Sequence, residues 1–331
     1  VGFSAVGCQT LNPYGRRIFE TGGSSSGSAV AVAANYAAAA LGSETSGSIL
    51  SPSSQNAVVG LKPTIGFVSR TGIVPISSTL DTSGPMTKSI VDTAILLDAI
   101  AAPDPQDKIT LRAPRLTAIL YSYVEPSLSG MRIGAMTNIL AADSLYQNAV
   151  EDLRAAGAEV IEFTPKKITL IGFTSILNGD MKRDIPAYFK NASTADFATI
   201  DVTAIIDFNK QDSLLYMPYS QKRLDGVIAD SITEEGLETT ISELNTAALG
   251  FFQDPIAEYE LDAIISKNNY YAGHAAIAFY PCLTVPMGYA DDGEPANLTF
   301  MAPSFSEVKL LKLGAAYERI SNHRKSPEGY Q

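Results

Sequence analysis

Apolar positions along the first hundred residues predict one buried helix, two short strands and a second helix. After Ser26, the run AVAVAANYAAAAL places small apolar residues on every face of a helix, which is typical of a helix inside a core. We expect this helix to end at Gly42. VVGLKP and IGFVS then predict two strands, and residues 89–101 have helical spacing that ends before Pro103.

The rest of the chain has the pattern of an α/β protein. Residues 103–130 are rich in Pro, Asp and Ser and predict a linking loop. MRIGAM, SLYQNAVEDLRAAG and AEVIEF predict a strand, a helix and a strand, a β-α-β unit that is typical of parallel sheets covered by helices. Residues 165–258 predict helices with loops and are rich in aromatic residues. DAIIS, CLTVPMG and EVKLLKLGAAYERI then predict two strands and a terminal helix.

Composition and charge exclude several classes of protein. A chain of 331 residues with 46% hydrophobic and 18% charged residues is a globular protein of one large or two modest domains. The net charge of −11 has the wrong sign for direct binding of nucleic acid, and no run of eighteen apolar residues predicts a membrane span. Cys8, Cys282, His274 and His323 lack the spacing of a metal site, and we expect both thiols to be buried.

Two loops rich in serine and glycine flank the predicted buried helix, GGSSSGS at 22–28 and GSETSGS at 42–48. The plain structural interpretation is a pair of turns that cap a helix. A phosphate loop is excluded because no lysine follows the glycines, and the GxSxG motif is absent. A Ser-His-Asp triad would need His274 or His323, but the apolar setting AGHAAIAF favours a packed core histidine at position 274.

A longer stretch that contains both loops resembles the amidase signature family. From Gly22 to Met86 the chain has a Gly/Ser-rich core in the family's order and spacing. The resemblance continues through GCQTLNPY and to about Ala101, returns in YPCLTVPMG and the last helix, and is greatest to peptide amidase-like members. It implies an α/β/α sandwich around a mixed, largely parallel sheet, with a helical subregion that covers the site.

The resemblance implies a single domain over residues 1–331. Within it, residues 1–102 would form the signature core and residues 103–164 the linker and the β-α-β unit. Residues 165–258 would form the variable helical region over the pocket, and residues 259–331 the return to the core.

The same resemblance assigns site residues. Ser48 matches the nucleophile of the family's T-x-G-S-I element, and Ser24 matches the bridging serine that follows a cis peptide bond. A hydroxyl between nucleophile and base can relay a proton. The backbone N–H groups of Thr45, Ser46 and Gly47, together with that of Ser48, match the oxyanion hole.

Four features of the chain depart from the family or qualify its pattern. The family's catalytic lysine precedes the bridging serine, but no lysine precedes Ser24 here, so we expect it in an N-terminal segment beyond this chain and expect the chain alone to be inactive. Lys62, in GLKPT, is a different family position with an expected structural role. Leu50 replaces an Arg of many members, and Glu44 matches an acidic position that we expect to accept structural hydrogen bonds.

The implied activity is hydrolysis of a carboxylic amide, with peptide C-terminal amides among the candidates, through an acyl-enzyme on Ser48. The partner is then a small-molecule or peptide amide, and no metal or organic cofactor is implied. Tyr216, Tyr219 and Phe208 are candidate pocket walls, with core packing as the other interpretation. Two alternatives stay open, a non-catalytic relative and a glutamine-hydrolysing amidotransferase subunit. The sequence leaves the oligomeric state and localisation undecided, with the cytoplasm slightly favoured.

Overall fold

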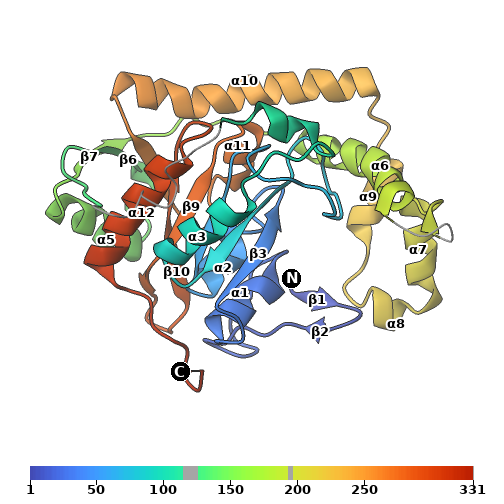
Figure 1. Cartoon of the computed structure of the whole chain (residues 1–331), viewed down its shortest axis with the longest axis horizontal. Helices are drawn as coiled ribbons and strands as arrows, with labels where there is room; N and C mark the ends of the chain where they lie inside the picture. The colour runs from blue at the N-terminus through green and yellow to red at the C-terminus, as the bar shows by residue number, and fades with distance from the viewer. Residues whose placement is uncertain (115–125, 193–196, 331) are drawn as a thin grey trace.

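An eight-stranded sheet forms the centre of the computed structural model, which describes residues 1–114, 126–192 and 197–330 (Figure 1). The strand order is β3-β5-β4-β9-β10-β8-β6-β7, and a separate hairpin pairs β1 (Phe3–Ser4) with β2 (Cys8–Gln9). The sheet strands are β3 Ala39–Glu44, β4 Val59–Lys62, β5 Thr82–Thr87, β6 Arg132–Met136, β7 Glu159–Phe163, β8 Ala263–Lys267, β9 Cys282–Tyr289 and β10 Pro295–Met301.

The sheet is mixed, and the expected α/β class is confirmed. β8 pairs with β6 and β6 with β7 in parallel, whereas the five other neighbouring pairs are antiparallel. The parallel share is therefore smaller than expected. Parallel neighbours need a crossover of about a dozen residues or more, which the predicted β6-α5-β7 unit supplies, whereas residues 290–294 join β9 to β10 directly.

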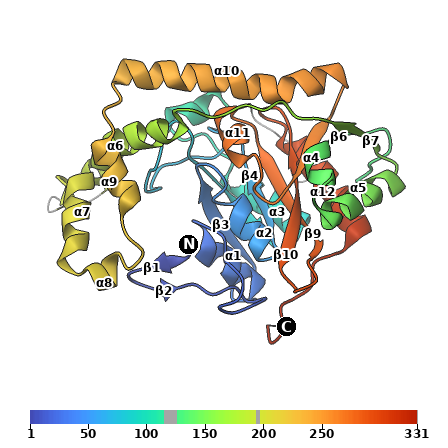
Figure 2. The same ribbon diagram turned by 180° about the vertical axis from the view of Figure 1, so that it is seen from behind.

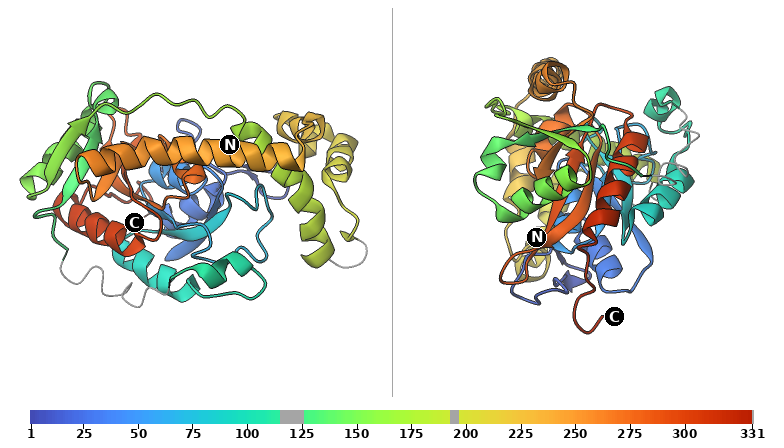
Figure 3. Two further views of the ribbon diagram at one scale, coloured as in Figure 1. Left: turned by 90° about the horizontal axis from the view of Figure 1, so that it is seen from above. Right: turned by 90° about the vertical axis from the view of Figure 1, so that its left-hand side faces the viewer.

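Helices cover both faces of the sheet and extend to one side of it (Figures 1 and 2). Seen from above, the long helix α10 crosses the molecule (Figure 3). The helices are α1 Ser26–Ala33, α2 Leu50–Gln55, α3 Ile90–Ile100, α4 Thr137–Leu140, α5 Ser144–Ala155, α6 Phe173–Ala192, α7 Val202–Gln211, α8 Ser213–Tyr216, α9 Lys222–Ala229, α10 Glu234–Glu258, α11 Ala272–Ile277 and α12 Glu307–Ser321, with a 3₁₀ turn at Lys108–Arg112.

Strand β9 shows how the two helical layers divide. Leu283 and Val285 face Gly314 of α12, where an added Cβ would lie 2.5 Å from Leu283. The hydroxyl of Thr284 points the other way and lies 3.3 Å from that of Ser54 in α2. Successive side chains alternate across a strand, so α12 and α2 cover opposite faces of the sheet.

Two local predictions in the signature core are wrong. The helix expected to reach Gly42 ends at Ala33, Asn35 has a φ of 61°, and Ala39–Glu44 form β3. Alanine packs equally well in either element, and asparagine adopts the left-handed conformation more readily than most residues, so the chain turns there. IGFVS forms only an isolated bridge between Ile65 and Val68 rather than a strand. The other predicted strands and helices are present, with ends shifted by a few residues.

Cys8 is exposed, contrary to expectation, while Cys282 is buried. Cys8 lies in a hairpin whose strands have two residues each and leave its side chain at the surface. Within the described ranges, no helix has the length and apolarity needed to cross a membrane. Part of the predicted linking loop, residues 115–125, lies outside the described residues.

Candidate active site

Ser48 lies in the turn between β3 and α2, which we call the Ser48 turn (residues 45–49). The next two side chains, Ile49 and Leu50, are fully buried. Ile49 belongs to a small apolar cluster that includes Ala29 of α1 and Met86 of β5. Apolar packing thus anchors the end of the turn, while Ser48 stays partly exposed.

The buried carboxylate of Glu44 holds the Ser48 turn from inside. Its Oε2 accepts the N–H groups of Ile49 at 2.7 Å and Leu50 at 2.9 Å. Burial raises the pKa of Glu44, and the charge of Lys62 and the N–H groups of Leu50, Ile49 and Gly47 oppose that rise. The place of the Gly47 N–H in the oxyanion hole stays a prediction.

The segment that carries Ser24 is bound directly to the Ser48 turn. The peptide bond between Gly23 and Ser24 is cis. The N–H of Ser25 donates to the carbonyl oxygen of Ser48 at 3.1 Å. The hydroxyl of Ser25 donates to the carbonyl oxygen of Ser43 at 3.0 Å and accepts its N–H at 3.1 Å. The structure thus brings together the two serine segments that lie 24 residues apart in the sequence.

The two candidate hydroxyls have no fixed partner within the described residues. Ser24 is exposed and Ser48 half-buried, and neither hydroxyl forms a hydrogen bond there, including one to the other. In the same part of the chain, the N–H groups of Ser46 and Ser48 are unpaired. These two donors remain free to bind an oxygen atom of a ligand beside Ser48.

Asp81 fixes the first residue of the turn, and it was not among the residues nominated from the sequence. The Thr45 hydroxyl donates to Oδ1 of Asp81 at 2.5 Å, and Oδ2 accepts the N–H groups of Ile76 and Ser77 at 2.8 and 2.9 Å. Burial raises the pKa of Asp81, and these hydrogen bonds oppose the rise. The available signal was a single acidic residue in the otherwise uncharged stretch ISSTLDTSGPM.

A cavity of about 680 Å³ adjoins Asp81 on the side of α6. Its wall includes Arg70 and Asp107, which form a two-point ion pair at 2.8 and 2.6 Å. Asp184 and Tyr188 of α6 complete the opposite side. Asp81 thus belongs both to the wall of this cavity and, through its bond with Thr45, to the support of the Ser48 turn.

Gly47 allows a close approach to the turn that follows β8. It has a φ of 106°, and a Cβ placed on it would lie 3.3 Å from Nδ2 of Asn269. A larger residue at position 47 would be strained and would press against Asn269. Asn269 is exposed, so its amide lies at the surface beside the Ser48 turn.

The aromatic residues nominated as pocket walls lie on the α7–α9 arm (residues 202–229), to one side of the sheet (Figure 1). The rings of Phe208 and Tyr216 contact each other at 4.7 Å, and Tyr219 packs edge-on against Phe3 at 5.6 Å. Within the described residues, no hydrogen bond or ring contact joins these three side chains to the Ser48 turn. Their role as walls stays a prediction.

In the described residues, no hydrogen bond joins Ser48 to any of the other candidate bases. His274 packs against Phe251 and Tyr271, with ring centroids 4.8 and 5.3 Å away, and burial lowers its pKa, which supports the interpretation as a packed core residue. His323 lies 3.3 Å from Asp152. Lys62 is fully buried and donates to the carbonyl oxygen of Tyr280 at 2.8 Å. In the described ranges, no group of three or more His, Cys, Asp or Glu side chains is arranged to hold a metal ion.

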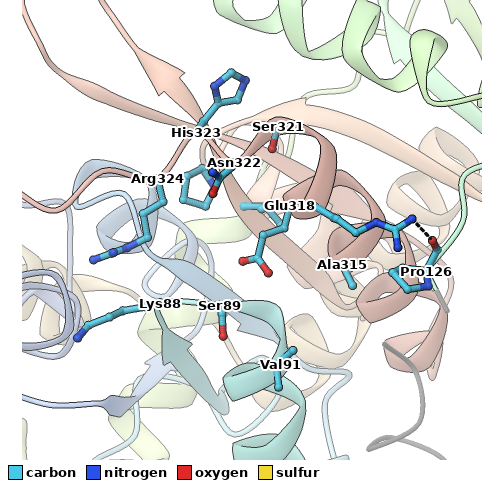
Figure 4. Close-up of a pocket in the computed structure, with 13 residues that line it drawn as sticks. Lys88, Ser89, Val91, Pro126, Ala315, Glu318, Ser321, Asn322, His323 and Arg324 are labelled. Carbon is cyan, nitrogen blue, oxygen red and sulfur yellow. Dashed lines mark hydrogen bonds between the residues drawn. The ribbon is translucent and has the colours of Figure 1, made fainter. Parts of the chain in front are cut away.

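A second cavity, of about 630 Å³, separates the first turn of α3 from the end of α12 (Figure 4). Glu318 points into it toward Ser89, and its carboxylate accepts the N–H of Ile90 at 3.1 and 3.2 Å. Burial raises the pKa of Glu318 to about 7. His323 lines this cavity, whereas Ser24 and Ser48 do not.

Comparison with known proteins supports the resemblance. The family profile described as Amidase matches residues 3–207. A probable amidase of Arabidopsis thaliana is 34% identical over 339 residues, which cover 99% of this chain and 65% of the relative. A subunit of the glutamyl-tRNA(Gln) amidotransferase of Deinococcus deserti is 30% identical over 366 residues, which cover 99% of this chain and 73% of the relative.

Solved structures agree with the fold. A crystal structure of an amidase family protein from Bacillus anthracis has a TM-score of 0.93 and 34% identity, covering 99% of this chain and 66% of that one. The peptide amidase of Stenotrophomonas maltophilia has a TM-score of 0.91 and 36% identity, covering 99% and 71%. The chain thus spans about two thirds of the length of these proteins. By its sequence, its fold and the order of its serine-rich loops, the chain belongs to the amidase family.

Proposed function

We propose that the protein hydrolyses carboxylic amides to an acid and ammonia or an amine. Membership of the amidase family supports the reaction class. The observation that carries the proposal is the 3.1 Å hydrogen bond from the Ser25 N–H to the Ser48 carbonyl oxygen, which binds the segment of Ser24 to the Ser48 turn. Proton transfer between a nucleophile and a bridging hydroxyl requires that their two oxygen atoms stay within hydrogen-bond distance, so their segments must be held together.

In the proposed mechanism the Ser48 hydroxyl attacks the carbonyl carbon of the amide. The free N–H groups of Ser46 and Ser48 bind the oxygen on which negative charge develops. Ser24 takes the proton of Ser48 and passes it to a base, and the amine leaves with a proton. Water then attacks the acyl-enzyme and releases the acid. In the described structure no lysine or histidine hydrogen-bonds to either serine, so the final base is not identified among these contacts.

The proposed substrates are neutral or peptide-terminal amides. The similarity to peptide amidase supports this class. Leu50, which replaces the Arg of many members, is 1% exposed and starts α2, so it offers no cation for a substrate carboxylate. Arg70, a cation that lines the cavity beside Asp81, is already paired with Asp107, so neutral groups are favoured over acidic ones.

The test is product analysis with the full-length protein and a peptide C-terminal amide. Ser48→Ala should lower kcat by at least about 10⁴-fold while the thermal unfolding temperature stays unchanged, because only one hydroxyl in a polar turn is lost. Ser242→Ala, on the exposed side of α10, is the matched control and should retain full turnover. Absence of acid and ammonia from every neutral amide tested would contradict the proposed function.

A role in a glutamine-hydrolysing amidotransferase is the second candidate. The observation in its favour is the 30% identity to the glutamyl-tRNA(Gln) amidotransferase subunit of Deinococcus deserti. That role would require ammonia transfer that depends on ATP and tRNA in the presence of a partner protein. Hydrolysis of a peptide amide by the protein alone, without ATP or tRNA, distinguishes a free amidase from it.

A further inference from the structure

Three buried titratable side chains lie together on the face of the sheet that α1 and α2 cover. Lys62 of β4 is directly opposite Cys282 of β9. The registers of β3 with β5 and of β5 with β4 place Glu44 on this same face, because opposed residues share a face and side chains alternate along each strand. All three are at most 1% exposed. They form a buried group directly beneath the Ser48 turn.

Lys62 is the cation of this group. Its Nζ donates to the carbonyl oxygen of Tyr280 at 2.8 Å, and no carboxylate lies within ion-pair distance of it in the described residues. A buried ammonium group is costly unless opposite charge compensates it. Glu44 and, at the start of α12, Glu307 are the carboxyl groups whose pKa the charge of Lys62 lowers.

Glu44 needs a cation in order to stay ionised. Its Oε2 already binds the N–H groups of Ile49 and Leu50, but its Oε1 is buried without a hydrogen-bond partner among the described residues. Burial favours the protonated acid, and the charge of Lys62 is the largest effect that opposes it. A carboxylate binds N–H groups more strongly than a neutral acid does, so the charge of Glu44 affects how firmly the Ser48 turn is held.

We propose that the buried charge of Lys62 keeps Glu44 as a carboxylate, so that Glu44 fixes the Ser48 turn and aligns Ser48 for attack. Lys62 is then a positioning residue that acts through Glu44 and does not touch the substrate. This inference rests on the proposed function for its effect on turnover. It explains why a lysine occupies the end of an otherwise apolar strand, VGLK, whose four residues are all buried.

The other ionisable groups around this pair have defined states or partners. Burial raises the pKa of Cys282 to about 12, so its thiol stays neutral and adds no charge. Glu307 accepts the N–H of Thr64 at 2.7 Å, and the charge of Lys62 opposes the rise that burial causes in its pKa. Asp81 binds the turn through the Thr45 hydroxyl. Among the described residues, Glu307 is therefore the competing carboxyl group that an experiment must separate from Glu44.

The first test measures turnover of a peptide C-terminal amide by the full-length protein as a function of pH. Lys62→Met keeps an unbranched side chain, one atom shorter, and removes the charge. We expect kcat to fall at least tenfold with little change in KM, and the acid limb of kcat/KM to move to higher pH. Lys62→Met combined with Glu44→Gln should be no slower than Glu44→Gln alone. An unmoved acid limb, or additive losses in the double variant, would overturn the proposal.

The second test needs no activity and so separates this inference from the proposed function. When the fold raises the pKa of a carboxyl group, the free energy of unfolding of the protein decreases as pH rises through that pKa. Removal of Lys62 raises the pKa of Glu44 further and therefore makes this decrease larger. The unfolding temperature of Lys62→Met should therefore fall further below that of the wild type between pH 5 and pH 8. In the Glu44→Gln background, the difference in unfolding temperature caused by Lys62→Met should not grow with pH. A difference in unfolding temperature between wild type and Lys62→Met that stays constant with pH would contradict the assignment. A difference that still grows with pH when Glu44→Gln is present would report Glu307 instead, and would contradict it as well.

Poor folding of the single variant would also be informative. If Lys62→Met does not fold at pH 7, the proposal requires that it fold at pH 5 or when combined with Glu44→Gln, since either change removes the uncompensated carboxylate. Failure of both rescues would show that Lys62 serves packing alone. If the wild type shows no turnover but the difference in unfolding temperature between wild type and Lys62→Met still depends on pH, only the proposed amidase function is refuted.

Discussion

The Ser48 region and the α7–α9 arm belong to one chain but are held together by different interactions. Around Ser48, buried polar groups have specific partners, such as Glu44 with two N–H groups and Asp81 with Thr45. The arm encloses only a small apolar cluster that includes Val202, Ile206 and Val227, and it exposes several large apolar side chains. Directional bonds place reacting atoms accurately, whereas a small apolar cluster tolerates substitution. We therefore expect the chemistry in the first region and an adjustable binding surface in the second.

After the loss of Ser48 itself, the largest effect on turnover should come from the bridging serine. Ser24→Ala removes the proposed proton relay but leaves the nucleophile, so kcat should fall by about 10²-fold or more, with residual activity. The exposed position of Ser24 means that the unfolding temperature should not change. Steady-state kinetics and a thermal scan check both parts. Wild-type turnover by this variant would remove Ser24 from the mechanism.

The next effect concerns packing and separates the two regions directly. Gly22 has a φ of 62°, and an added Cβ would lie 2.6 Å from the backbone nitrogen of Pro52, so Gly22→Ala should destabilise the protein by about 2–4 kcal/mol. Gly226 of α9 has open space around it, and Gly226→Ala should stabilise by up to about 1 kcal/mol. Denaturant unfolding of both variants measures this contrast. Similar changes at the two positions would contradict it.

A smaller effect is expected in the arm. Tyr219→Ala removes the ring contact with Phe3, which is worth about 0.5–1.5 kcal/mol, and should leave kcat unchanged. If Tyr219 is a pocket wall, KM for peptide amides rises by about three- to tenfold; if it only packs on Phe3, stability changes and KM does not. A marked loss of kcat would mean that the arm takes part in the chemistry after all.

The smallest effect lies in the cavity between α3 and α12. The raised pKa of Glu318, about 7 against 4.5, means that its stabilising contribution is complete below about pH 4.5 and is lost as pH rises through 7. Glu318→Gln should make the free energy of unfolding less dependent on pH in this range, by on the order of 1 kcal/mol when screening by solvent is considered. Turnover should not change, since Glu318 lies apart from Ser48. Unfolding curves at pH 5 and pH 8 provide the comparison, and an unchanged slope would refute the assignment.

Much of the fold follows from periodic sequence patterns, and the failures have physical causes. The β6-α5-β7 unit and helix α12 were predictable because their apolar residues repeat at helical or strand spacing. The alanines of β3 fit a helix or a strand equally well, so pattern alone misassigned them. β5 and β10 went unpredicted, since each contains a proline, and β5 also a glycine, that weakens a strand pattern.

The candidate site was partly predictable. Ser24 and Ser48 were nominated from their resemblance to a family motif, and the structure joins their segments. The role of Asp81 and the placement of Lys62 and Glu44 on one face of the sheet were not foreseen, because each depends on strand register or on a contact between residues far apart in the chain. A single sequence does not show such contacts. The assignment of the Gly47 N–H to the oxyanion hole stays a prediction, and the motif does not reveal that Glu44 binds the following N–H groups from inside.

The central claim is that Ser48 carries the acyl group during turnover. Mass spectrometry of the full-length protein, quenched during hydrolysis of a slow peptide or aryl amide and digested, tests this most directly. The account predicts an acyl adduct on the peptide that contains Ser48, absent from Ser48→Ala. An adduct on any other residue, or steady turnover by Ser48→Ala, would contradict it.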